Sequence, residues 1–134
     1  MTTEEPNAGG GSQEPAISAC EFASLVEMVG TELPDVLIDL LDTYLEESAG
    51  LVGALQSAKA RDREAEMLRP AHSLKSSSAS VGAMRLSALC AALEEYLRQG
   101  RGPLDTGAQV DRIAAEFARV VQALEQEKLQ LRSR

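Results

Sequence analysis

The sequence is poor in aromatic residues. It contains no Trp, two Tyr and two Phe, although 44% of its 134 residues are hydrophobic. Leu and Ala dominate that fraction, and this composition favours helix–helix packing over a β-sandwich, whose strands use aromatic and β-branched residues. The length is within the range of one domain and allows one modest core.

Cysteine and histidine are also scarce. Cys20 and Cys90 lie far apart in the sequence and do not have the spacing of metal ligands, and His72 is the single histidine. We interpret both cysteines as packing residues in a reducing cytosol rather than as a disulfide. A metal site built from one histidine and distant cysteines is not expected, and we predict no cofactor.

Long apolar runs and an excess of positive charge are missing too. The formal net charge is −8, which argues against nucleic-acid binding, because that requires clustered cations. No segment approaches the roughly 20 apolar residues that span a bilayer. The first 15 residues have neither a basic start nor an apolar stretch, so we expect no secretory signal and a cytoplasmic protein.

The pattern of apolar residues predicts helices. Residues 1–16 are rich in Gly, Glu and Pro and are expected to be a disordered tail, whereas residues 17–134 are expected to form the folded domain. A short helix is predicted from Ser18, which forms a capping-box pattern with Glu21, to about Val29. Pro34 is well placed to start a helix of about 25 residues, because apolar residues then recur with the helical period.

Three further helices follow. One is predicted from about Asp62 to Ser80, the next from about Ala83 to Gln99, and the last begins at a second capping-box pattern, Thr106 with Gln109. No segment shows the alternation of a strand. The predicted fold is all-α: an antiparallel up-down four-helix bundle with an additional short N-terminal helix.

His72 is predicted to lie on the outer face of its helix. At about 100° per residue, the side chain lies roughly 140° away from the face that should meet the core. Pro70, two residues earlier, should remove a helical hydrogen bond, so the helix either kinks there or begins its regular part there. The residues that share the expected core face are Met67, Ala71, Leu74, Ser78 and Val81.

The surroundings of His72 suit phosphoryl chemistry. A largely neutral imidazole offers a ring nitrogen as a nucleophile. Lys75, one turn further along, places an ammonium beside an anion on the ring, and the neighbouring side chains are small enough to admit another protein. Residues 61–85 carry a net charge of +2 and the rest of the chain −10, which favours a partner with an acidic docking site.

These residues resemble a known family. The thirteen residues 71–83, AHSLKSSSASVGA, look like the signature of histidine-containing phosphotransfer (HPt) domains, which belong to multistep two-component phosphorelays. The close match covers about residues 62–100, and the bundle layout extends it to nearly the whole ordered chain. The next helix of the family is also similar to residues of this chain, namely Leu86, Leu89, Cys90, Leu93 and Glu94.

The resemblance implies specific roles. His72 would accept a phosphoryl group, through its outer ring nitrogen, from an aspartyl phosphate on a receiver domain, and would pass it to the aspartate of a second receiver. The receivers belong to hybrid histidine kinases and response regulators, and magnesium would sit in the receiver. Members of the family have no kinase or phosphatase activity of their own, and we expect a monomer. Lys75 would stabilise the phosphoryl group, and the expected docking residues are Leu68, Arg69, Ser76, Ala79 and Arg85.

Some alternatives stay open. Many family members have glycine where this chain has Ser76, whose hydroxyl could crowd the phosphoryl group or hydrogen-bond to it. The chain could instead be a module that sequesters a receiver without transferring phosphate. It could also be the phospho-accepting domain of a chemotaxis-type histidine kinase, which would require a larger parent protein.

Overall fold

The computed structural model describes residues 14–29, 34–100 and 102–133. Across these ranges the chain is helical and contains no strand, which confirms the predicted all-α class. None of the described helices is both long and apolar enough to cross a membrane. The elements are α1 (Ala19–Val29), α2 (Pro34–Ala60), the 3₁₀ helix η3 (Glu64–Met67), α3 (Leu68–Ser80), α4 (Met84–Gln99) and α5 (Thr106–Arg132).

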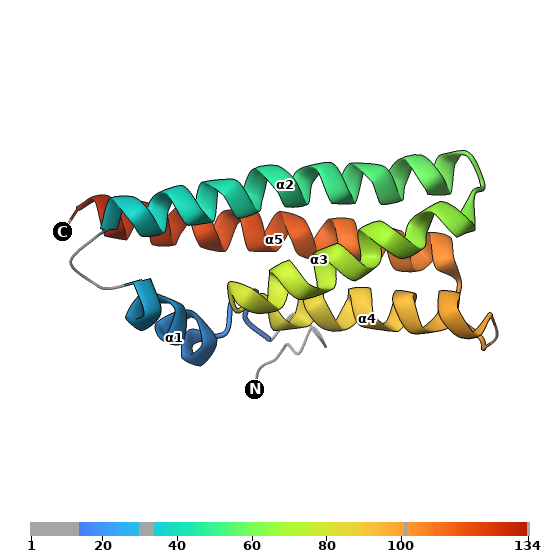
Figure 1. The fold of residues 1–134 in the computed structure, drawn as a ribbon, viewed down its shortest axis with the longest axis horizontal. Coiled ribbons are helices and arrows are strands. Elements are labelled where there is room, and N and C mark those ends of the chain that lie inside the picture. The colour runs from blue at the N-terminus through green and yellow to red at the C-terminus, as the bar shows by residue number, and fades with distance from the viewer. Residues whose placement is uncertain (1–13, 30–33, 101, 134) are drawn as a thin grey trace, which may run out of the picture.

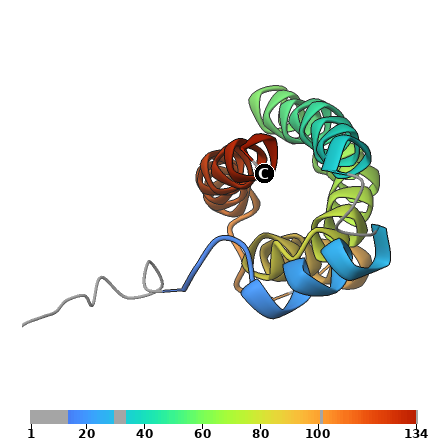
Figure 2. The same ribbon diagram turned by 90° about the vertical axis from the view of Figure 1, so that its left-hand side faces the viewer.

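Helices α2 to α5 form the predicted antiparallel bundle. Successive helices run in opposite directions along the long axis (Figure 1), and the end view shows them arranged around a common interior (Figure 2). Each helix packs on its neighbours, α2 on α3, α3 on α4, α4 on α5 and α5 on α2. The interior is filled mainly by fully buried aliphatic side chains, including Leu37, Leu41, Leu55, Leu74, Leu86, Leu93, Ile113 and Leu124.

The short helix α1 covers an end of the bundle that the shorter helices leave open. Helices α2 and α5 each have 27 residues, which corresponds to about 40 Å, whereas α4 has 16 residues, or about 24 Å. Helix α1 lies beyond α3 and α4 along the bundle axis, next to the start of α2 (Figure 1). Its Phe22 and Leu25 are buried in the same core as Leu37 and Leu41 of α2.

The packed chain begins earlier than the expected domain boundary. Most of the expected tail, residues 1–13, lies outside the described residues. Ala16, which the sequence assigned to that tail, is buried, and the Glu14 carbonyl oxygen accepts a hydrogen bond of 2.6 Å from Arg119 of α5. Ser18 N–H then donates to the Gly82 carbonyl oxygen at 2.8 Å. The segment before α1 is therefore tied to α5 and to the turn between α3 and α4.

Helix α3 begins later than predicted. The sequence predicted a start near Asp62, but Asp62 has a φ of 56° and residues 64–67 form a 3₁₀ turn. Pro70 explains the difference, because its ring would clash with the carbonyl of residue 66 in a regular α-helix. As the third residue of α3, Pro70 lies in the first turn, where amide groups lack intrahelical acceptors anyway. The regular part of the helix thus begins near Pro70.

The predicted cap of α5 was wrong by one residue. Asp105 is the N-cap, and its carboxylate accepts a hydrogen bond from the Ala108 amide at 3.1 Å. Thr106 instead donates its hydroxyl to Glu64 at 2.7 Å, and the Gln109 amide donates to the Leu89 carbonyl at 2.9 Å. The capping side chain is thus the carboxylate one position earlier, while Thr106 and Gln109 link α5 to other elements.

The two cysteines differ in their environments. Both are free, as predicted, but only Cys90 packs in the core, where burial raises the pKa of its thiol to about 12. Cys20 is exposed, so its interpretation as a packing residue was wrong. It precedes Phe22 on α1, and only the Phe22 side of this short helix faces the bundle.

Candidate functional site

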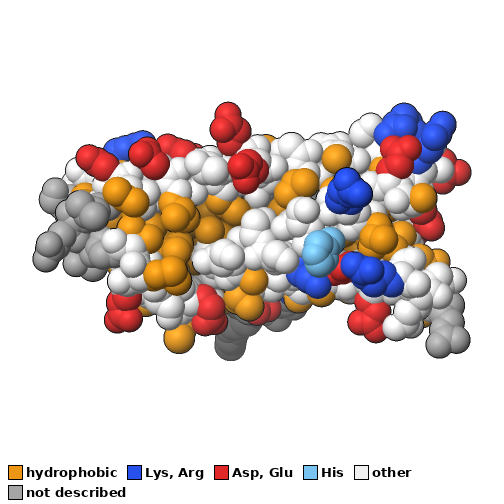
Figure 3. Space-filling model, viewed as in Figure 1, with side chains coloured by type: hydrophobic (Ala, Val, Ile, Leu, Met, Phe, Trp, Pro, Cys, Tyr) orange, Lys and Arg blue, Asp and Glu red, His pale blue; other side chains and the backbone are white. Residues whose placement is uncertain are grey.

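His72 projects from the outer face of α3, as predicted. The expected core-facing residues of this helix are buried, whereas 53% of the His72 side chain is exposed. The space-filling view shows the imidazole at the surface of the bundle, with basic side chains beside it (Figure 3). The ring is therefore within reach of another protein.

Glu94 of α4 holds the inner edge of the His72 ring. The Nδ1 atom of His72 lies 2.7 Å from Oε2 of Glu94. A carboxylate can only accept a hydrogen bond, so Nδ1 carries the proton in the neutral ring and Nε2 carries the lone pair. The contact thus selects the tautomer in which Nε2 is the nucleophilic nitrogen.

Two cations hold Glu94 in its ionised form. Its side chain is only 7% exposed, and Oε1 accepts from the Lys75 ammonium at 2.6 Å. Arg98 donates from both Nη2, at 2.7 Å, and Nε, at 3.1 Å, to Oε2. The hydrogen bond from Lys75, and next the one from Arg98, lowers the pKa of the Glu94 carboxyl to about 2, below its usual 4.5. The group is therefore anionic at any physiological pH.

Two shallow cavities flank this cluster. One of about 350 Å³ is lined by His72 with Arg69 and Arg98, together with Ala65 and Leu68. The guanidinium groups give it the charge that an anion on the ring would require. The other, of about 290 Å³, lies beside Lys75 and Glu94. Arg98 lines both cavities.

The expected docking residues do not all lie together. Leu68 and Arg69 share the cavity of His72. Ser76 is exposed and Ala79 is half-buried on the following turns of α3. Arg85, in contrast, lies 3.4 Å from Glu116 of α5 and 3.7 Å from Glu14, so its guanidinium is engaged with the N-terminal segment and α5 instead of the Glu94 cluster.

Sequence reasoning missed the roles of Glu94 and Arg98. Glu94 was noted only as part of the family-like helix, and Arg98 was not considered. A signal was present: Glu94 follows Cys90 by four residues, and therefore shares the side of α4 that carries the core residues. A carboxylate on the core-facing side of a helix, with an arginine one turn later at Arg98, indicates that the carboxylate is buried in an ion pair.

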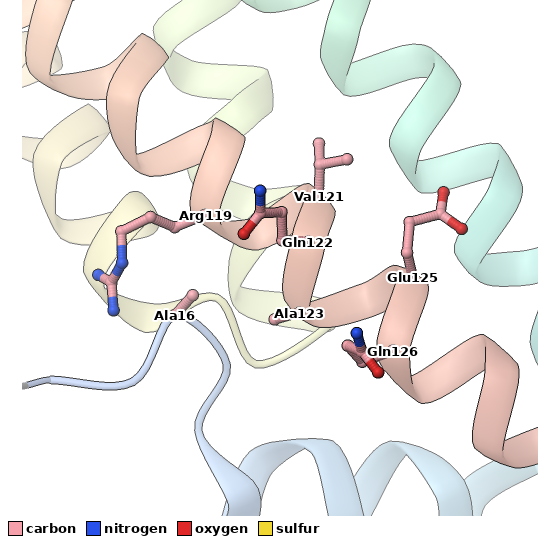
Figure 4. A pocket seen from close by; sticks show the side chains of 7 residues that line it. All are labelled: Ala16, Arg119, Val121, Gln122, Ala123, Glu125 and Gln126. Carbon is pink, nitrogen blue, oxygen red and sulfur yellow. The ribbon is translucent and has the colours of Figure 1, made fainter.

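A larger hollow lies along α5, away from this cluster. It has a volume of about 730 Å³, and the close-up shows its side chains on α5 together with Ala16 (Figure 4). Its lining contains no histidine, and the side chains that line it are Ala16, Arg119, Val121, Gln122, Ala123, Glu125 and Gln126. Among the described residues there is also no cluster of three or more metal-ligating side chains. Histidine chemistry is thus confined to the surface around His72.

Comparisons with known proteins agree with this site. Residues 39–130 match the Hpt domain family. The structure of histidine-containing phosphotransfer protein B (HptB) from Pseudomonas aeruginosa PAO1 superimposes with a TM-score of 0.75 at 30% sequence identity, covering 87% of this chain and 96% of that one. No curated protein matches the chain significantly. The chain therefore belongs to the Hpt domain family, and its role is histidine phosphotransfer in a phosphorelay.

Proposed function

We propose that this protein carries phosphoryl groups between receiver domains, accepting them on Nε2 of His72 from one receiver aspartate and donating them to another. The observation that carries the proposal is the half-exposed ring whose Nδ1 is held by Glu94. This arrangement presents Nε2 as the nucleophile. HptB, which the chain resembles over most of its length, is named as a histidine-containing phosphotransfer protein.

In this proposal the chain supplies a nucleophile, positive charge and a docking surface. Phosphoryl transfer depends mainly on positioning and on stabilisation of charge. Lys75 stabilises the phosphoryl group, since its ammonium is one turn from His72 and is already oriented by Glu94. The receiver supplies the aspartate and the magnesium ion, so the chain needs no cofactor or kinase activity of its own.

The proposed docking surface follows α3. Leu68 and Arg69 lie on one side of His72, and Ser76 and Ala79 continue along the helix on the other. Arg69 would face the acidic site of a receiver, where electrostatic attraction speeds association. A cytoplasmic monomer that exposes this one surface would suit sequential contacts with two receivers.

The test mixes the protein with a phosphorylated receiver domain. We expect a label on the protein that is labile in acid and stable in alkali, as a phosphoramidate bond is, and that is absent from the His72→Gln variant. Label that persists in the variant would overturn the assignment of His72. Binding to the receiver without any label would identify a sequestering module instead.

A further inference from the structure

The serine hydroxyls of α3 differ in what they bind. Those of Ser77 and Ser80 donate to backbone carbonyls one turn earlier, at 3.0 Å and 3.1 Å. The hydroxyl of Ser78 lies 2.8 Å from that of Tyr44 in the core. Ser76 is exposed, and no group within the described ranges of the chain forms a hydrogen bond with its hydroxyl. This hydroxyl is therefore open to a group that reaches α3 from outside.

Ser76 lies one turn after His72, on the flank opposite Lys75. At about 100° per residue, Ser76 is rotated about 40° to one side of His72 and Lys75 about 60° to the other. The Lys75 ammonium binds Glu94 of α4, so Ser76 lies on the flank that faces away from α4. Residues one turn apart have Cβ atoms about 5–6 Å from each other. Helical side chains lean toward the N-terminus, so that of Ser76 covers the turn of His72.

We propose that the Ser76 hydroxyl donates a hydrogen bond to an oxygen of the phosphoryl group on Nε2 of His72, and that this bond slows the loss of the phosphoryl group to water. The inference rests on the proposed function of His72. It assigns Ser76 as a phosphoryl-binding residue as well as a part of the docking surface. A hydroxyl suits this role, because it donates to an oxyanion without adding charge to the surface.

The cations near the ring approach a phosphoryl group from other sides. Nδ1 of His72 lies 2.7 Å from Oε2 of Glu94, so a group bonded to Nε2 projects away from that carboxylate. Arg69 and Arg98 line the cavity that joins the ring to the preceding turn of the chain. Ser76 occupies the following turn. Since a phosphoryl group offers three acceptor oxygens, the hydroxyl adds a donor on this side without displacing a cation.

A hydrogen bond to the phosphoryl oxygens should slow hydrolysis. In this reaction the Nε2–P bond breaks and its electron pair returns to Nε2, while a water molecule adds to phosphorus with both of its protons and gives inorganic phosphate. The transition state is loose, so the oxygens lose negative charge as the bond to Nε2 stretches. A donor bound to such an oxygen consequently stabilises the phosphorylated protein more than it stabilises the transition state.

The test is the lifetime of the phosphorylated ring. The wild type, Ser76→Ala, Ser76→Gly and Ser73→Ala are phosphorylated with phosphoramidate and freed of reagent, and the decay of the phosphohistidine resonance is followed by ³¹P NMR at neutral pH. The resonance is unambiguous, because the chain has one histidine. Ser73 is the matched control: it is also exposed, but as the next residue after His72 it does not face the ring.

We expect the phosphoryl group to be lost about 3- to 10-fold faster from Ser76→Ala than from the wild type, since water replaces part of the lost hydrogen bond. Ser76→Gly should match Ser76→Ala, and Ser73→Ala should match the wild type. Alanine favours a helix more than serine does, so Ser76→Ala should keep the fold of α3.

Equal decay in the wild type and Ser76→Ala would overturn the inference, as would a Ser73→Ala variant that decays as fast as Ser76→Ala. Decay from Ser76→Gly as slow as from the wild type would also overturn it, because the size of the side chain would then control the rate. Phosphoramidate supplies the label, so these results do not depend on a receiver. Failure to exchange phosphate with any receiver would overturn the proposed function alone.

Discussion

His72 Nδ1 and Glu94 Oε2, 2.7 Å apart, connect α3 to α4 at the surface of the bundle. The contact joins an exposed ring to a carboxylate that is almost fully buried. The ring is consequently oriented by the bundle, although it is reachable from outside. A rigid scaffold that positions a reactive group in this way reduces the entropy lost when a partner docks.

Lys75 should affect phosphoryl transfer more than protein stability. We expect Lys75→Gln to slow labelling of His72 by a phosphorylated receiver by about 10- to 100-fold, because a charge-assisted hydrogen bond to the phosphoryl group is lost. Lys59→Gln is the control, since Lys59 pairs with Asp111 of α5 instead. Equal labelling rates for wild type and Lys75→Gln would show that the ammonium does not act on the phosphoryl group.

The ionised Glu94 should make stability depend on pH in acid. Its pKa is lowered by folding to about 2, so the folded state binds its proton less readily than the unfolded state does. The contribution of the ionised Glu94 to the free energy of unfolding is therefore complete above the unfolded pKa of about 4.5, and it is lost as the pH falls toward about 2. We expect Glu94→Gln to unfold about 1–2 kcal/mol more easily in urea at neutral pH, because water screens the partly exposed cations.

That difference from the wild type should shrink when the urea titrations are repeated at progressively lower pH. A difference that stays constant between about pH 6 and pH 3 would mean that the Glu94 carboxylate is not stabilised by its cations.

Gly82 should not tolerate a side chain. Its φ is +86°, and an added Cβ would lie 3.2 Å from the Phe22 amide nitrogen. We expect Gly82→Ala to lower the free energy of unfolding by about 1–3 kcal/mol. Gly50 lies within α2 with nothing within 4 Å of an added Cβ, so Gly50→Ala should instead stabilise by about 0.5–1 kcal/mol. Urea denaturation measures the free energy of unfolding of both variants. Equal changes in Gly82→Ala and Gly50→Ala would show that the backbone at Gly82 does not require glycine.

Substitution of Arg69 should weaken receiver binding, whereas substitution of Arg85 should lower the stability of the fold. Arg69 lines the cavity of His72, whereas Arg85 contacts the buried Glu116. We expect Arg69→Ala to slow association with a receiver several-fold at low salt and less at high salt. Arg85→Ala should leave association unchanged and lower stability, because Glu116 loses one of its cations. Stopped-flow binding measures the association rate, and urea unfolding measures the stability. Slower association of Arg85→Ala with an unchanged rate for Arg69→Ala would show that the docking surface lies at Arg85 instead.

Periodicity predicted the faces of the helices well. The apolar residues of α3 placed His72 outside, because one helix face must be buried whatever it packs against. Periodicity did not fix the helix ends. Asp105 and Thr106 can both cap a helix, and which of them caps α5 depends on the contacts of Thr106 with Glu64 and of Gln109 with Leu89.

The pattern of the sequence did not predict the contacts between helices. His72 and Glu94 lie 22 positions apart on different helices, and only the packing of α3 against α4 brings their side chains together. The length of the turn at Gly82 and the burial of Leu86 and Leu93 set that register. Likewise, the position of Arg85 in the sequence does not indicate that it pairs with Glu116 of α5 and with Glu14, which precedes α1.

Passage of the phosphoryl group through His72 is tested most directly by a two-receiver experiment. A labelled first receiver and an unlabelled second receiver, chosen so that they do not exchange phosphate directly, are mixed with the wild type or with His72→Gln. We expect label to pass to the wild type and then to the second receiver, and to remain on the first receiver with His72→Gln. Label that reaches the second receiver equally fast with the variant would contradict the proposed carrier role.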